Sequence, residues 1–83
     1  MEGGDNMAVE YDYNYMRGWV RQHFKTNKAY ADFLGIGETA LYDRLACRVP
    51  FSQKEIDITA HFGNCSMEEV QKLFFTRKIR KTV

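Results

Sequence analysis

Residues 26–45 read T-N-K-A-Y-A-D-F-L-G-I-G-E-T-A-L-Y-D-R-L, and this stretch decides the fold of the chain. Thr26 is a suitable N-cap for a short helix, and Gly35 suits the left-handed position that ends one. A second short helix follows the Gly-Ile-Gly turn, with Leu41 and Leu45 one helical turn apart on its inner face. Two short helices joined by so tight a turn cannot run antiparallel over much length. The stretch therefore predicts two helices that cross at a steep angle.

The flanking sequence predicts three more helices. Apolar residues recur at helical spacing from about Tyr13 to Phe24, and two S-x-x-E sequences open further helices after Ser52 and Ser66. The apolar residues expected to face the core from these helices are Met16, Trp19, Val20 and Phe24, then Ile56, Ile58 and Phe62, then Val70, Leu73 and Phe74. After Phe75 the pattern ends, which leaves a terminal strand or a loose tail, and we expect the loose tail. The expected fold is all-α, a compact bundle of about five short helices.

Length and charge indicate one small domain with two polar ends. The chain has 83 residues, of which 45% are hydrophobic, enough for a single core. Its formal charge of +1 conceals a polarised molecule, because residues 1–12 carry four acidic and no basic side chains, whereas residues 75–83 carry four basic and no acidic ones. We expect a flexible acidic leader at 1–12, a folded domain at 13–75 and a basic tail at 76–83. Such a tail suits nucleic-acid phosphate, an acidic partner or simply solvent.

Several classes of function are not indicated. No apolar run approaches the length that spans a bilayer, and no signal sequence is evident, so we expect a cytoplasmic protein that does not bind membranes. Cys47 and Cys65 form neither a C-x-x-C motif nor a zinc-ligand pattern, so neither a metal nor another cofactor is expected. No catalytic grouping or phosphate-binding Gly-rich loop is present, and we expect neither enzymatic activity nor a small-molecule substrate.

The ordered series of helices around residues 26–45 resembles the lambda-repressor-like helix-turn-helix superfamily, in particular the small Cro-type and repressor-type regulators of bacteriophages. The resemblance covers roughly residues 13–75. The matching positions are Thr26, Ala31, Leu34, Gly35, Ile36, Leu41 and Leu45, followed by the F-S-Q-K-E-I sequence at 51–56. It implies a transcriptional regulator of phage or prophage type that binds double-stranded DNA.

The predicted helix at about 38–46 is the one expected to read DNA. The major groove admits one helix with an apolar inner face and a polar outer face, and the outward positions here are Glu38, Thr39, Tyr42 and Asp43. These four are the candidate base-reading residues. The candidate phosphate contacts are Asn27, Lys28, Arg44, Arg48, Arg77, Lys78, Arg80 and Lys81.

Two of the four reading positions are acidic, which is unusual for a helix that approaches phosphate. A carboxylate can accept a hydrogen bond from cytosine N4, but affinity must then come from the basic residues. Glu38 could instead serve the helix dipole, Tyr42 could pack at the core edge, and Asp43 could pair with Arg44 or Arg48. The alternative function is a helical protein-interaction module, such as an anti-regulator or antitoxin-like adaptor, on the same scaffold.

We also expect a homodimer on a pseudo-palindromic operator. One short helix that reads about four base pairs cannot select a site in a genome, whereas a two-fold pair of helices can. The interface expected from the sequence is Val70, Leu73, Phe74 and Phe75, since so small a domain has limited means of covering its own apolar surface.

Overall fold

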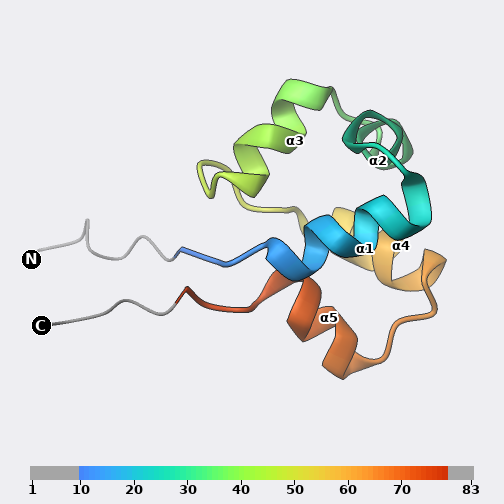
Figure 1. The fold of residues 1–83 in the computed structure, drawn as a ribbon, viewed down its shortest axis with the longest axis vertical. Helices are drawn as coiled ribbons and strands as arrows, with labels where there is room; N and C mark the ends of the chain where they lie inside the picture. Colours follow the sequence, from blue (N-terminus) through green and yellow to red (C-terminus); the bar gives the residue numbers. More distant parts are fainter. Residues whose placement is uncertain (1–9, 79–83) are drawn as a thin grey trace, which may run out of the picture.

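The computed structural model describes residues 10–78, which form five helices and a short antiparallel bridge. Helix α1 (Asn14–Phe24) crosses the middle of the molecule, with α2 (Asn27–Leu34) and α3 (Glu38–Leu45) on one side and α5 (Met67–Phe74) on the other (Figure 1). Helix α4 (Gln53–Phe62) packs against α2 and α5. The expected all-α fold is confirmed. None of these helices is long and apolar enough to cross a membrane.

Local capping sets most of the helix ends. The Thr26 hydroxyl accepts a hydrogen bond from Ala29 N at 3.1 Å, and Gly35 ends α2 with φ 79°. Ser52 and Glu55 form the complete capping box predicted for α4. Because these contacts lie within one turn of chain, the helix boundaries follow closely from the sequence.

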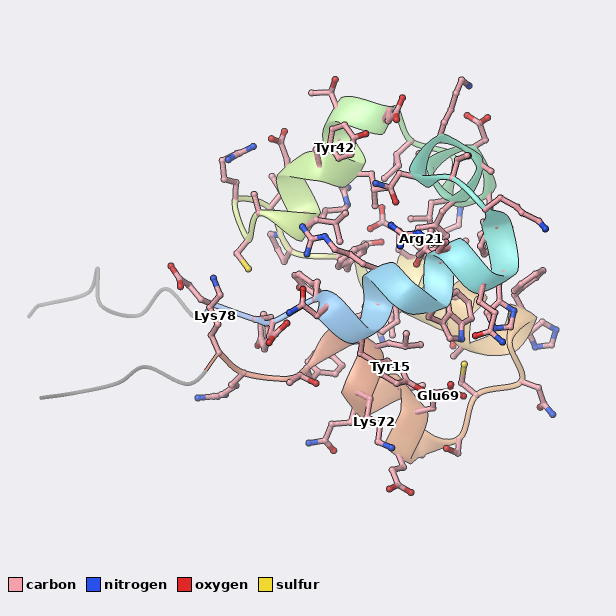
Figure 2. All side chains as sticks on the ribbon, in the orientation of Figure 1. Tyr15, Arg21, Tyr42, Glu69, Lys72 and Lys78 are labelled. Carbon is pink, nitrogen blue, oxygen red and sulfur yellow. The ribbon has the colours of Figure 1, made fainter. Side chains whose placement is uncertain are left out.

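The cap of α5 differs from the expected box. Ser66 Oγ accepts from Glu69 N at 3.1 Å. The Glu69 carboxylate, however, accepts a hydrogen bond from the Tyr15 hydroxyl at 3.0 Å, which joins α5 to α1 (Figure 2). The Lys72 ammonium lies 6.0 Å from the centre of the same tyrosine ring. Glu69 thus contributes a contact between two helices.

The core lies between the five helices, with α1 packed directly against α2 and α5. Its buried members are Tyr13, Met16, Trp19, Val20, Tyr30, Ala31, Leu34, Leu41, Leu45, Phe51, Leu73 and Phe74. At the end of α4, a Cβ on Gly63 would come within 2.7 Å of the Trp19 side chain and 3.0 Å of Cys65 Sγ. Glycine at this position therefore lets the turn approach Trp19 closely.

The inward face of α4 differs from the prediction. Its buried residues are Glu55 and Thr59, whereas Ile56 and Ile58 are half-buried and Phe62 is 48% exposed. Both buried polar groups have partners: Thr59 Oγ1 lies 2.8 Å from the Tyr30 hydroxyl, and Glu55 pairs with Arg44, described below. Burying Glu55 and Thr59 without hydrogen-bond partners would be costly. Because their partners lie on α3 and α2, the inward face of α4 depends on these other helices.

The two ends of the described chain run side by side (Figure 1). Tyr11 and Arg77 form an antiparallel bridge, with hydrogen bonds from Asp12 N to Thr76 O at 2.7 Å and from Lys78 N to Glu10 O at 3.0 Å. Residues 10–12 of the expected leader and 76–78 of the expected tail thus belong to the folded part of the chain. At residues 76–78 the chain forms a single bridge, and residues 79–83 of the expected tail lie outside the described residues.

Candidate nucleic-acid interface

Helix α3 packs on the core through one face and exposes the opposite one. Leu41 and Leu45 are buried, at i and i+4. Helices α2 and α3 pack against each other, and they cross steeply, with α2 seen nearly end-on in Figure 1 while α3 lies across the view. The residues left outward on α3 form a polar ridge.

Three of the four candidate reading residues are exposed on this ridge: Glu38, Thr39 and Tyr42. The Tyr42 hydroxyl donates a hydrogen bond to Glu38 Oε2 at 2.9 Å, within one helical turn. This bond requires the hydroxyl proton and therefore raises the pKa of Tyr42, while the nearby Asn27 amide opposes the rise. Glu38 is thus held against Tyr42, and Tyr42, which is 46% exposed, is surface and not core.

The fourth candidate, Asp43, is half-buried and paired. Its Oδ1 lies 3.0 Å from the Arg48 guanidinium, which also donates from Nε at 3.1 Å. The pair lies at the end of α3, where Cys47 adopts a left-handed conformation with φ 65°. Asp43 therefore holds Arg48 beside the C-terminal end of α3.

The expected phosphate contact of Arg44 is wrong, because its guanidinium is buried against Glu55. Its side chain is 14% exposed and that of Glu55 9%. The guanidinium donates two hydrogen bonds to the Glu55 carboxylate, at 2.8 and 3.1 Å, and a third to Ala40 O at 2.9 Å. Both Arg44 and Glu55 are visible in the sequence, but their separation of eleven residues gives no sign that they pair in the folded protein.

Glu55 is charged because Arg44 and its own helix cap stabilise the carboxylate. Burial alone would raise the pKa of Glu55, but the hydrogen bonds from Arg44 and Ser52 and the Arg44 charge outweigh burial, so the pKa lies below its ordinary value of 4.5. The pair joins α3 to the start of α4. It thereby fixes the position of the exposed ridge.

The remaining candidate phosphate contacts lie in two separate places. Asn27 and Lys28 are at the start of α2, with Lys28 Nζ 3.1 Å from Asp32. Lys78 lies at the opposite end of α1 from Arg21 (Figure 2), 3.8 Å from Glu10. Arg77 is in the bridge, while Arg80 and Lys81 lie outside the described residues.

The expected dimer surface is only partly a surface. Leu73 and Phe74 are almost completely buried within the monomer and cannot contact a partner, because α5 turns them against the rest of the core. Val70 is half-buried and Phe75 is 44% exposed. Met67, which is 83% exposed, lies on the same helix and was not anticipated, because it precedes the apolar stripe of α5.

Helix α1 carries a row of basic residues that are not among the phosphate contacts expected from the sequence. Arg17, Arg21 and Lys25 recur every four residues, and that spacing was the signal for a shared face. In Figure 2, Arg21 lies on the side of α1 toward α2 and α3, while Tyr15 and Lys72 lie toward α5. The row is therefore on the same side of α1 as the exposed ridge.

These features constitute a polar surface made of the ridge of α3, the start of α2 and one face of α1. No protein-family model matches the chain, and no curated protein is significantly similar to it.

Proposed function

We propose that this protein is a sequence-specific, duplex-DNA-binding transcriptional regulator of phage or prophage type, with α3 in the major groove. The observation that carries the proposal is the division of α3 into a buried face, Leu41 and Leu45, and an exposed ridge of Glu38, Thr39 and Tyr42. A helix that enters the groove needs both. The resemblance of residues 13–75 to the lambda-repressor-like regulators supports the same function.

In this proposal α2 and α3 act together as a helix-turn-helix. Thr39, Glu38 and Tyr42 would contact the base edges in the groove. The hydrogen bond from Tyr42 already restricts the Glu38 side chain, so Glu38 would lose less conformational entropy on binding. Asn27 and Lys28 lie at the start of α2, where a phosphate at the groove edge would be met. A regulator of this kind would act in the cytoplasm, with the DNA.

A gel-shift titration tests this function. We expect the protein to bind a site in the DNA that flanks its own coding region at least about 10³-fold more tightly than random duplex of equal length. The Thr39→Ala variant should keep the fold and lose part of this preference. Equal binding of both duplexes at low salt would contradict sequence-specific regulation.

The alternative is a helical adaptor that binds protein. It is favoured by the charges near α3. Glu38 and Asp43 place two carboxylates on this helix, and the nearby cations Arg48 and Lys28 each already pair with an acid. If no duplex is bound at micromolar protein, the same ridge becomes a candidate surface for a basic protein partner.

We further propose that the protein binds DNA as a homodimer. The surface open to a second copy is a shallow groove of about 520 Å³ on the outside of α5, lined by Met67, Glu68, Val70, Gln71 and Phe75. In an antiparallel pair of α5 helices centred on Gln71, Met67 of one copy would lie opposite Phe75 of the other on both sides of the axis. The surface is thus self-complementary.

Analytical ultracentrifugation tests the dimer. Phe75→Asp should weaken self-association about tenfold or more, because it replaces an aromatic side chain packed in the interface by a charge that would have to be buried there. Phe62→Asp is the matched control, since Phe62 is similarly exposed on a different helix. A monomer in both free and operator-bound states would refute the dimer, and a dimer unaffected by Phe75→Asp would place the interface elsewhere.

A further inference from the structure

The cations of α1 form one row along the helix. Arg17, Arg21 and Lys25 are all exposed and are spaced at i, i+4 and i+8, which places them on one side. Residues 14–24 include no acidic side chain, and the first turn of α2 has none either. These two segments therefore bring basic and no acidic side chains to this part of the surface, and the nearest carboxylate from α3, that of Glu38, is hydrogen-bonded to Tyr42.

The row lines a pocket. A cavity of about 190 Å³ lies between the second half of α1 and the start of α2, bounded by Arg17, Val20, Arg21, Lys25 and Asn27. Val20 is buried and supplies the apolar wall. Lys25 ends α1 with φ 73°, and its N–H bonds to Arg21 O and Val20 O at 3.2 Å, which fixes the backbone at the corner of the pocket. The cavity has room for a small anion.

Among the described residues, no carboxylate forms an ion pair with Arg17, Arg21 or Lys25. Within residues 10–78, the ion pairs involve other cations: Lys28 with Asp32, Arg44 with Glu55, Arg48 with Asp43 and Lys78 with Glu10. Like charges one helical turn apart repel one another. An anion placed among Arg17, Arg21 and Lys25 would remove this repulsion.

The start of α2 adds hydrogen-bond donors to the same place. Thr26 Oγ1 accepts from Ala29 N, and Tyr30 N donates to Thr26 O, but in the described part of the chain the N–H groups of Asn27 and Lys28 have no acceptor. The first N–H groups of a helix and its dipole favour an anion. Two independent features, the cation row and this helix end, therefore meet at Asn27.

We propose that Arg17, Arg21, Lys25 and Asn27 form a pocket that binds one phosphate group of a nucleic-acid backbone. Guanidinium groups match phosphate oxygens with paired hydrogen bonds. The pocket adjoins the proposed reading surface, because Asn27 lies close enough to Tyr42 of α3 to affect the titration of its hydroxyl. This inference rests on the proposed DNA-binding function and adds α1 to the surface that contacts DNA.

In the first test, inorganic phosphate is titrated into the whole 83-residue protein, and the backbone amide signals are followed by NMR. Chloride is used to keep the ionic strength constant. We expect saturable shifts of the backbone amides around residues 17–28, lost in Arg21→Gln and kept in Lys54→Gln. Lys54 is an exposed lysine on α4 and is not among the residues that line the pocket. Since Arg21 and Lys25 are both exposed, Lys25→Gln provides a second folded variant. Shifts that are not saturable, or that spread over the whole chain, would overturn the pocket.

The second test uses duplex DNA. Arg21→Gln should reduce the slope of log affinity against log salt by up to about 0.9 and weaken binding to all duplexes alike, while Lys54→Gln leaves the slope unchanged. If the protein binds its operator but Arg21→Gln has the same salt slope as the wild type and as Lys54→Gln, the pocket does not bind DNA phosphate, and the proposed function stands. If phosphate binds the pocket but the protein binds no duplex, then both the proposed DNA-binding function and DNA as the ligand of the pocket are wrong. The pocket would then be a site for phosphate alone.

Discussion

Replacing Arg44 by Ala is expected to lower the free energy of unfolding by about 3–5 kcal/mol, the cost of leaving a buried carboxylate without its partner. The Glu55 side chain is 9% exposed and would lose two hydrogen bonds and the opposite charge. Since the same guanidinium donates to Ala40 O, the end of α3 would loosen as well. Denaturant unfolding followed by circular dichroism measures the change.

Arg48→Ala is the matched control for this result. Arg48 is also paired with an acid near the end of α3, but its side chain is 65% exposed. Solvent and salt screen such a pair, so its loss should cost less than about 1 kcal/mol. Equal losses of unfolding free energy in the two variants would show that the buried Arg44–Glu55 pair stabilises the fold no more than the exposed Asp43–Arg48 pair does.

The same pair predicts a dependence on pH. The pKa of Glu55 is lowered in the folded state, so the carboxylate stabilises the fold above its unfolded pKa of about 4.5, and this contribution is lost as the pH falls through the folded-state value. The difference in stability between wild type and Arg44→Ala should therefore be largest at neutral pH and should shrink in acid. A difference that does not change with pH would exclude the charge of Glu55 as its cause.

Leu41→Ala is expected to cost about 2–5 kcal/mol, because Leu41 is fully buried beneath the ridge of α3 and its removal leaves a cavity. The proposed binding to DNA would then be lost through loss of structure. Thr39→Ala lies on the opposite face and should change stability by about 0.5 kcal/mol or less, while it shifts preference at one base pair by about 1–3 kcal/mol.

Comparison of melting temperature with operator affinity separates these outcomes. Tyr42→Phe keeps the ring and removes the hydrogen bond to Glu38, so it tests whether that bond holds Glu38 in position for a base. If Thr39→Ala and Tyr42→Phe both leave DNA preference unchanged, α3 is not the reading helix. The ridge would then be a candidate surface for a protein partner.

Helix number and boundaries were accessible from the sequence because the interactions that set them are local. Thr26 caps a backbone N–H three residues away, Gly35 adopts the left-handed conformation that ends α2, and Ser52 and Glu55 cap each other. The inward positions of Met16 and Leu41 follow from helical spacing in the same way. These features predict five helices and the exposed face of α3.

Only the tertiary structure decided which polar residues are buried and which basic residues form ion pairs within residues 10–78. Arg44 and Glu55 lie inside because they meet across two helices, and Thr59 lies inside because Tyr30, twenty-nine residues earlier, provides its hydrogen bond. Leu73 and Phe74 were expected at an interface but fill the core of the monomer. Helical spacing determines which side chains share a face, but a buried polar group needs a partner from elsewhere in the chain, and that partner is set by packing.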